Sequence, residues 1–522
     1  MDLNLQEKEG VNSMSEKGAR QTRFVVAGLM LAILMSAMDN TIVATAMGRI
    51  VDDLGGYDQL VWVTSAYMIA LMAGTPIFGK LSDMYGRKRF FIFGIIVFLM
   101  GSALCGTAGS ITQLSVYRAI QGIGGGALMP IAFTIVFDIF PPEKRGKMSG
   151  LFGAVFGISS IFGPLLGAVI TDHIGWEWVF YINIPLGILA LFFIGTYYKE
   201  SLSHSKQRID WVGAFTLVGA IVCLMFALEL GGQKYAWDSG MILGLFGGFV
   251  VLLAVFLYTE TKVAEPIISF KMFRKRLFAS SVLTSLFYGS TFIIATIYIP
   301  IFIQGVYGGS ATNSGLLLMP MMIGSVVGSQ VGGFLTTKLS FRSIMMISAV
   351  FFLAGVVSLG FISPDTARFV VTLEMILLGF GVGYSFSVLN MAAIDGFDMR
   401  QRGAATATTT FMRSLGMTLG ITIFGIIQRN IFTSRLETAF GGKAPIGGGG
   451  GGNQQFLTPE GRKAIPAEVL SKIEAALATS ISHTFLWALI PAVAAVIMVL
   501  LMPGTRMTMS RKPEPKQELR TE

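Results

Sequence analysis

Three charged side chains lie deep inside long apolar stretches of this chain, where a charge is costly and therefore indicates function. Asp39 lies in MDNTIVATA, Arg118 in LSVYRAIQG and Glu374 in VVTLEMILL. Desolvation favours the neutral form of such a carboxylate, whereas a nearby guanidinium favours its charged form. A group held between these two effects takes up and releases protons near neutral pH. Asp39 is therefore the first candidate for proton coupling, with Arg118 tuning it and Glu374 as the next carboxylate.

The apolar stretches are long enough to cross a lipid bilayer. The chain has 522 residues, of which 53% are hydrophobic and 13% charged, with a mean hydropathy of +0.67. Soluble domains are about 25% charged, so the composition indicates a membrane protein. A span needs roughly 20 apolar residues. We therefore predict fourteen spans, near 24–47, 60–79, 90–109, 112–137, 148–171, 177–197, 211–231, 240–259, 278–303, 313–337, 343–362, 367–391, 404–428 and 483–502.

The three charges are expected at similar depth. Asp39 comes about fifteen residues into the first span, roughly 22 Å from the inner face of an apolar core about 30 Å thick. Arg118 and Glu374 lie roughly 9 and 10 Å from the outer face by the same rise per residue. Structural roles stay open as well: Asp39 could be satisfied by hydroxyls such as Thr41, Arg118 could be an ion-pair strut, and Glu374 could face outer water.

Two other charges near spans have simpler interpretations. Arg413, near the middle of the thirteenth span, is expected to be a packing or backbone-carbonyl anchor. Glu229 comes at the outer end of the seventh span, where we expect it to touch water.

Cations mark the sidedness of these spans. The segment GKLSDMYGRKR, Gly79–Arg89, lies between two long apolar runs and holds Lys80, Arg87, Lys88 and Arg89. The positive-inside rule makes this side cytoplasmic. An even number of spans then places both termini there too. Asp83, among these cations, is best interpreted as a helix-end acceptor.

The same segment resembles the signature loop between helices 2 and 3 of the major facilitator superfamily. The pattern G-x-L-x-D-x-x-G-R-K-R places Gly79, Asp83, Gly86, Arg87 and Lys88 in matching positions. The resemblance implies that these residues take part in gating. Arg118, Gln121 and Gly122 match the family's second signature, whose arginine is associated with proton transfer.

The fifth span is similar to the motif of exporters in that superfamily. In GAVFGISSIFGPLLG, small residues recur at a spacing that lets a neighbouring helix approach closely, and a proline bends the span. The matching residues, expected to serve conformational change, are Gly153, Gly157, Gly163, Pro164 and Gly167.

Three further stretches resemble the fourteen-span drug:proton antiporter branch. They are Asp39–Thr41, Trp176–Gly187 and Tyr298–Pro320. The branch usually has arginine between the two tryptophans, where this chain has Glu177. The resemblance implies an all-α major facilitator fold of two six-helix bundles with an inserted two-helix hairpin at 211–259.

The implied organisation divides the chain into five parts. They are a cytoplasmic tail at 1–23, a bundle at 24–197, a linker with the hairpin at 198–277, a bundle at 278–502 and a tail at 503–522. The second bundle includes an external loop at 429–482. This loop contains the glycine run 447–452, expected to be flexible, and a short amphipathic helix at 466–479.

The resulting hypothesis is a proton-coupled antiporter that exports small hydrophobic or cationic compounds by alternating access. The 29 methionines and 41 phenylalanines could line an adaptable apolar pocket between the halves. Candidate substrate contacts are Asp39, Gln121, Tyr298, Gln304 and Glu374. Alternatives are a dedicated exporter of one metabolite, antibiotic or lipid-like compound, a proton-coupled symporter, a non-transporting receptor and a channel.

Other functional classes find no support in the sequence. No G-x-x-x-x-G-K-[ST] motif is present, so an ATP-driven pump is not expected, and neither is an enzyme. The formal charge of +9 comes from loops that flank spans, so no nucleic acid is needed to explain it. We expect no cofactor or metal, and we expect a monomer in the cell membrane of a bacterium, with protons, small molecules and lipid as its partners.

Overall fold

Long helices make up most of this computed structural model, which describes residues 2–55, 61–200, 210–232, 234–263, 265–308, 311–441, 462 and 465–507. Within these ranges, fourteen helices are long and apolar enough to cross a membrane, and no β-strand is present. The expected all-α class with fourteen spans is confirmed.

The helices form two halves and a hairpin that separates them in sequence. The sixth span is made of two pieces, α6 (Trp178–Tyr181) and α7 (Asn183–Tyr197). The N-terminal half contains α1 (Asp2–Leu54), α2 (Val61–Tyr85), α3 (Arg87–Cys105), α4 (Ile111–Ile139), α5 (Pro142–His173), α6 (Trp178–Tyr181) and α7 (Asn183–Tyr197). The hairpin is α8 (Trp211–Leu230) and α9 (Gly240–Lys262). The C-terminal half contains α10 (Phe270–Phe273), α11 (Arg276–Gly305), α12 (Ala311–Leu335), α13 (Phe341–Leu359), α14 (Arg368–Ile394), η2 (Met399–Gln401), α15 (Arg402–Ala439) and α17 (Ala467–Leu501).

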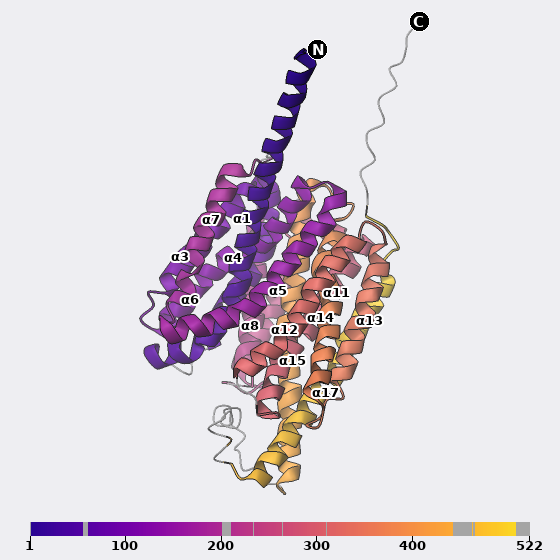
Figure 1. Ribbon diagram of the computed structural model, residues 1–522. Coiled ribbons are helices and arrows are strands. Elements are labelled where there is room, and N and C mark those ends of the chain that lie inside the picture. Colours follow the sequence, from indigo (N-terminus) through magenta and orange to yellow (C-terminus); the bar gives the residue numbers. More distant parts are fainter. Residues whose placement is uncertain are drawn as a thin grey trace.

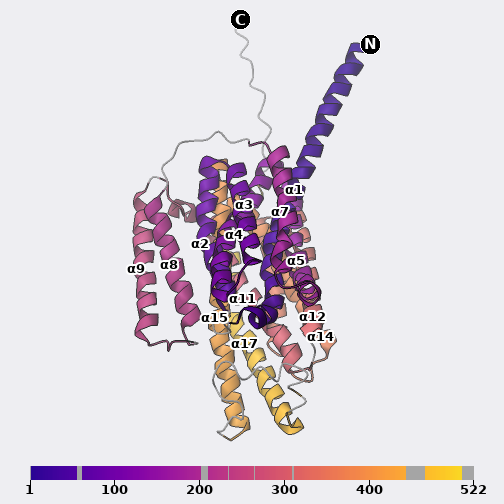
Figure 2. The same ribbon diagram turned by 90° about the vertical axis from the view of Figure 1, so that its left-hand side faces the viewer.

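The two halves lie side by side, with α5 between them (Figure 1). The helix α1 begins, and α17 ends, at the same end of the bundle, which we call the termini side; the other end is the opposite side. The hairpin lies on one flank, beside α2 (Figure 2). In its outer helix, α9, only 11% of the most apolar 18-residue stretch is buried, the smallest share among the fourteen spans. The rest of this stretch faces the surroundings.

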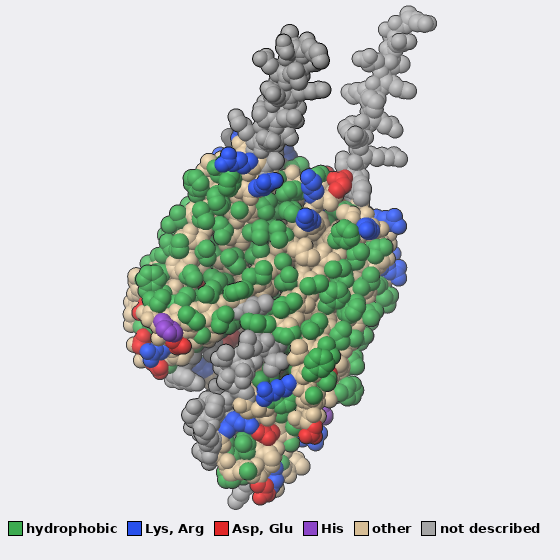
Figure 3. Space-filling model, in the orientation of Figure 1, with side chains coloured by type: hydrophobic (Ala, Val, Ile, Leu, Met, Phe, Trp, Pro, Cys, Tyr) green, Lys and Arg blue, Asp and Glu red, His purple; other side chains and the backbone are tan. Residues whose placement is uncertain are grey.

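An apolar belt covers the face of the molecule between its two ends (Figure 3). Large side chains such as Phe215, Val250 and Phe369 are exposed on the helices. Soluble monomers rarely expose apolar patches of this extent. On the visible face, Lys and Arg gather toward the ends rather than in the belt (Figure 3). The surface is therefore suited to lipid around its waist.

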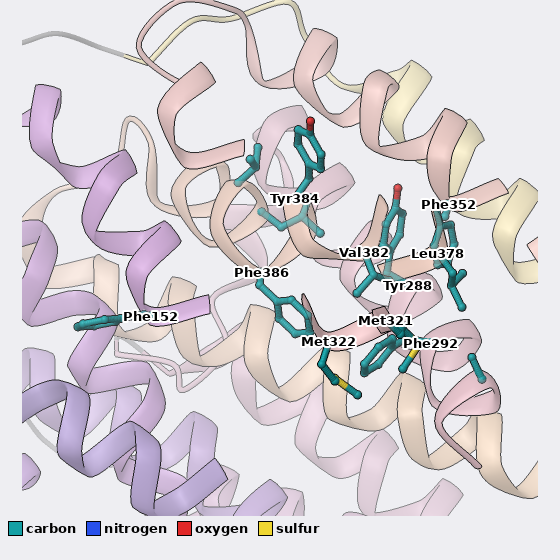
Figure 4. Packing of buried hydrophobic residues seen from close by; sticks show 14 of the residues in the cluster. Phe152, Tyr288, Phe292, Met321, Met322, Phe352, Leu378, Val382, Tyr384 and Phe386 are labelled. Atoms are coloured by element: carbon teal, nitrogen blue, oxygen red, sulfur yellow. The ribbon is translucent and has the colours of Figure 1, made fainter. Parts of the chain in front are cut away.

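Inside each half, helices pack closely where small residues face large ones. In the C-terminal half the rings of Tyr288 and Phe352 stack with centroids 4.1 Å apart. Leu378 and Val382 lie beside them (Figure 4). A Cβ on Gly381 would come within 2.4 Å of the Phe352 backbone nitrogen, so α13 and α14 can approach this closely only with glycine there.

Three helices extend beyond the spans expected from hydropathy. α1 continues from the first span back to Asp2, through residues expected to be a tail. α15 runs on to Ala439, and α17 joins the expected amphipathic helix 466–479 to the last span as one helix from Ala467. No glycine or proline interrupts 429–439 or 467–482, which explains the continuity. The expected external loop 429–482 is thus largely helical where it is described, and its glycine run lies outside the described residues.

Candidate functional site

Asp39 lies fully buried on α1, at the centre of a network of polar side chains in the N-terminal half. Its Oδ2 pairs with Nη1 of Arg118 on α4. Its Oδ1 accepts hydrogen bonds from Nε2 of Gln121, at 2.8 Å, and from Nδ2 of Asn183, at 3.1 Å. Both carboxylate oxygens therefore have partners, as a buried charge requires.

Arg118 is held in place by groups other than the carboxylate. Its Nε donates to the carbonyl of Val63 on α2 at 3.1 Å, and its guanidinium lies 4.1 Å above the ring of Tyr67. Its Nη1 also donates to Oε1 of Gln121 at 2.7 Å. The arginine is 1% exposed, so the ion pair is removed from water. The expected pairing of Asp39 with Arg118 is present in the structure.

A second layer supports the side chains that bind Asp39. The hydroxyl of Ser102 on α3 accepts from the amides of Gln121, at 3.1 Å, and Asn183, at 3.0 Å, and donates to the carbonyl of Phe180 at 2.9 Å. Sequence reasoning did not select Ser102 or Asn183. The signal available for Asn183 was an amide within the apolar motif at 176–187. Thr41 instead donates to the Met38 carbonyl at 2.9 Å.

On the termini side, the signature loop joins the two halves. Both oxygens of Asp83 accept backbone hydrogen bonds, from Gly403 and Ala404 in the first turn of α15, each at 2.9 Å. A carboxylate at a helix N-terminus satisfies free amides and complements the helix dipole. Gly79 makes the approach possible, because a Cβ there would lie 2.2 Å from the Cβ of Ala407.

Buried ion pairs extend this contact. Arg87, which is 0% exposed, pairs with Asp83 at 3.3 Å and also with Asp138 at the end of α4. Arg402, from the C-terminal half, pairs with the same Asp138 at 3.6 Å. The cluster thus includes side chains from both halves.

The rest of the loop holds the adjacent helix ends. Gly86 has a φ of 112°, a conformation that L side chains rarely adopt, and it begins α3. The ammonium of Lys88 donates to the carbonyls of Gly195 and Tyr198, both at 2.7 Å, at the end of α7. The carboxylate of Glu200 accepts from the backbone amides of Arg87 and Lys88 at 2.9 and 3.0 Å. These cations are therefore structural partners of helix termini.

The glycines of α5 face two different neighbours. A Cβ on Gly153 would lie 2.0 Å from Oγ of Ser329, and one on Gly157 would lie 2.6 Å from Val326, both on α12 of the other half. Farther along, Gly163 and Gly167 meet α1 instead, where a Cβ would lie 2.0 Å from Oγ1 of Thr41 and 2.2 Å from Oγ1 of Thr45. Pro164, inside the helix, lies next to this change of partner.

Gly146 and Gly333 form a second close approach of α5 and α12, between the two backbones. A Cβ on either residue would come within about 2 Å of the other's carbonyl oxygen (2.0 and 2.1 Å). On the termini side the halves therefore contact each other where α2 meets α15 and where α5 meets α12, in addition to the ion pair between α4 and α15.

A cavity of about 370 Å³ lies between the halves. Five methionines and eight hydroxyl side chains line it, together with aliphatic residues and one phenylalanine. Methionine adapts to ligands of different shape, which suits a site for varied compounds. The lining residues are Ile33, Ser36, Ala37, Thr64, Ser65, Met68, Leu71, Met72, Thr75, Gly125, Met129, Pro130, Phe156, Met225, Leu228, Glu229, Ile293, Thr410, Ser414, Met417, Thr418, Ile421 and Thr422.

The five residues expected to contact substrate do not line this cavity. Asp39 and Gln121 lie in the network within the N-terminal half. Tyr298 is buried on α11, and the carbonyl of Gln304 on the same helix accepts from Arg462 at 3.2 Å. Glu374 is half-buried on α14 of the other half, so the structure does not bring it to Asp39.

The structure also places the two charges for which simpler roles were expected, Arg413 and Glu229. Arg413 donates to the carbonyl of Ser385 at 2.9 Å and lies 4.7 Å from the ring of Phe386, in keeping with the expected backbone anchor. Glu229 lies one residue before the end of α8, as expected, and its side chain belongs to the cavity wall. The hydropathy of a single span does not show which neighbour its end faces.

Fourteen spans, two halves and a cavity between them define a membrane transporter. A model of the Major Facilitator Superfamily matches residues 29–421, about three quarters of the chain. The chain belongs to this superfamily, as its motifs predicted, and is a transporter and not an enzyme.

Individual relatives cover almost the whole chain. It is 59% identical over 490 residues to multidrug resistance protein 3 of Bacillus subtilis (strain 168), covering 93% of this chain and 96% of that protein. It is 36% identical over 486 residues to the multidrug transporter protein MdtP of the same organism, covering 90% of each.

Solved structures show the same fold at low sequence identity. The proton:xylose symporter XylE matches with a TM-score of 0.59 and 15% identity, covering 94% of this chain and 98% of that one. The human organic anion transporter MFSD10 matches with a TM-score of 0.58 and 14% identity, covering 90% and 99%. The predicted major facilitator fold is confirmed.

Proposed function

We propose that this protein is a proton-coupled antiporter that exports hydrophobic or cationic compounds across the bacterial cell membrane by alternating access. The observation that carries the proposal is the buried Asp39–Arg118 pair on helices that also line the cavity between the halves. The names of the two Bacillus subtilis relatives, both described as multidrug proteins, support drugs as the substrates.

The geometry supports a role for Asp39 as the proton acceptor. When the carboxylate is charged, it compensates Arg118; when it is protonated, the guanidinium keeps Gln121 Oε1 and the Val63 carbonyl as acceptors. Arg118 thus loses one partner but not its position. Such a change in charge within a low-dielectric site alters the relative free energies of two conformations.

α1 connects this site to the cavity and to α5. Ser36 and Ala37 of α1 line the cavity, less than one turn before Asp39. Thr41 and Thr45 of the same helix contact Gly163 and Gly167 of α5. A shift of α1 on protonation would therefore change both the cavity wall and the helix that continues to the contact with α12.

We also propose that the termini side is cytoplasmic, because Lys and Arg concentrate in the loops there. The conformation described here, with α2 on α15 and α5 on α12, is then closed toward the cytoplasm. Asp83 at the N-terminus of α15 stabilises that state, and its contacts must break before substrate can enter from inside.

The test is transport into inverted membrane vesicles under an imposed pH gradient. Uptake that requires the gradient, and proton efflux that accompanies substrate uptake, are expected. Substrate and proton movement in the same direction would instead identify a symporter, and transport without dependence on the gradient would contradict proton coupling. A panel of neutral and cationic drugs separates a multidrug exporter from a dedicated exporter of one compound.

A further inference from the structure

The inserted hairpin contributes directly to the cavity between the halves. Met225, Leu228 and Glu229 of α8 belong to its wall. The ring of Phe226 lies 4.6 Å from that of Trp62 on α2, so α8 is packed onto the transporter core. One apolar cluster includes Met72 of α2, Met225 of α8 and Phe411 of α15. The hairpin is therefore a structural part of the cavity and not only a lipid-facing addition.

Glu229 is the one charged side chain among the described residues that line this cavity. Its carboxylate accepts a hydrogen bond from the hydroxyl of Ser65 on α2. This hydroxyl is neutral and does not balance the negative charge. No ion pair found among the described residues includes Glu229. Asp39 differs in this respect, because Arg118 already compensates it. A carboxylate on a cavity wall that has no ion-pair partner is a site where a cationic ligand gains electrostatic energy.

The neighbours of Glu229 suit a ligand with a large apolar surface. Met225 precedes it by four residues, so both lie on the same face of α8. Ser65, Met68 and Met72 follow one another on α2 at the spacing of one helix face, and all three line the cavity. Polarisable thioethers around one carboxylate match an organic cation whose charge is surrounded by apolar groups.

We propose that Glu229 is the counter-ion for lipophilic monocationic substrates and that the inserted hairpin thereby sets cation selectivity. The proposal rests on the proposed function, in that the cavity between the halves is taken as the substrate site. It assigns proton coupling and cation recognition to different carboxylates, Asp39 and Glu229. Neutral substrates use the methionines and hydroxyls of the same cavity without this charge.

The test compares two ligands of similar aromatic content, tetraphenylphosphonium as the cation and triphenylphosphine oxide as the neutral compound. Equilibrium binding is measured on the purified full-length protein in nanodiscs, without any gradient. In Glu229→Gln the ratio of cation affinity to neutral affinity is expected to fall about tenfold, the effect of losing one charge-assisted contact. Glu229→Asp keeps the charge and should restore most of the ratio.

A matched control removes a carboxylate that does not line the cavity. Asp172 is exposed at the end of α5, on the same side of the molecule as Glu229. Asp172→Asn should leave the affinity ratio at the wild-type value. A similar fall in Asp172→Asn would mean that general surface charge, and not Glu229, attracts the cation. The thermal unfolding midpoint of each variant shows whether the fold is retained.

Two results overturn the proposal. One is an unchanged affinity ratio in folded Glu229→Gln, and the other is a ratio that Glu229→Asp does not restore. Failure of the proposed function is detected separately, by the wild-type protein transporting the neutral compound into inverted vesicles without any need for a pH gradient. The binding experiment does not depend on coupling, so the two ideas can fail independently.

Discussion

The carboxylate of Asp83 accepts a 2.9 Å hydrogen bond from the backbone amide of Gly403, 320 residues later in the chain. It accepts a second from Ala404. Hydrogen bonds to a charged group contribute about 1.5–3 kcal/mol each, so these two contacts are large in comparison with the few kcal/mol that separate conformations.

The first prediction concerns this contact. Asp83→Asn removes the charge and one acceptor oxygen, and we expect the population of the closed termini side to fall about tenfold or more. Spin labels on the exposed residues Arg89 and Lys338, one in each half, measure the distance by pulsed electron resonance in a protein without its two cysteines. Asp365→Asn, in an exposed loop, is the matched control. An unchanged distance distribution in Asp83→Asn would show that the contact does not control closure.

The second prediction concerns α5. Gly163→Leu places side-chain atoms where Oγ1 of Thr41 lies, since even a Cβ would be 2.0 Å from it. We expect α5 to be forced away from α1, with export lost and membrane insertion intact. Gly244→Leu, on α9, is the matched control, because a Cβ there meets nothing within 4 Å. Drug efflux from cells and protein in the membrane fraction are measured together, and normal efflux by Gly163→Leu would remove the mechanistic role of this packing.

The third prediction separates coupling from binding at Asp39. Asp39→Asn keeps the size and the hydrogen bonds of the protonated acid but cannot titrate. We expect substrate binding to survive and gradient-driven transport of both a neutral and a cationic compound to be lost. Uptake into inverted vesicles is the measurement. If Asp39→Asn transports both compounds normally under the gradient, the coupling residue lies elsewhere, and Glu374→Gln is the next variant.

The fourth prediction concerns the support of the buried carboxylate. Asn183→Ala removes the donor 3.1 Å from Asp39 Oδ1. Leaving a buried polar group with fewer partners costs about 1–3 kcal/mol, and the unfolding free energy should fall by that amount. In a background of Asp39→Asn the same substitution should cost less, because its charged partner is absent. Chemical unfolding in detergent measures both values, and equal costs would show that Asn183 acts independently of Asp39.

The fifth prediction concerns orientation. Single cysteines at 232–238 and 441–453 should react with a membrane-impermeant thiol reagent added outside intact cells, whereas those at 80–89 and 271–276 should not. Permeabilised cells, in which exposed positions of the second group such as Arg89 also become accessible, provide the control. Labelling of 80–89 from outside would reverse the orientation and therefore the direction of every step proposed here.

Sequence and structure agree where a family motif, or the free-energy cost of an uncompensated buried charge, determines which groups a residue contacts. The charges Asp39 and Arg118 must be compensated inside apolar helices, and their opposite signs at matched depth predicted the pair. Glu374, expected at a similar depth, lies on α14 of the other half, so depth alone does not identify partners. Asp83 was predicted as a helix-end acceptor from its place among cations. The family followed from the loop 79–89 and the glycines of α5.

The rest depended on packing that hydropathy does not encode. Ser102 and Asn183 are neutral and could have satisfied themselves on the nearest carbonyl. The amide of Asn183 within an apolar motif indicated a polar partner, but nothing in the sequence identified that partner as Asp39. Glu229 comes at the end of an apolar run, where depth alone suggests water, and only the placement of α8 beside α2 turns it toward the cavity. The helical continuation of α15 and α17 was missed because a span was expected to end with its apolar stretch.

The position of α8 has a consequence for lateral access from the bilayer. α8 occupies the flank where α2 and α15 would otherwise meet lipid directly, and it supplies the cavity wall there. A compound dissolved in the surrounding leaflet cannot reach the cavity along this flank unless the hairpin moves aside. For an exporter of oily compounds, we expect this shield to limit futile cycling, in which molecules just released into the membrane return to the cavity they left.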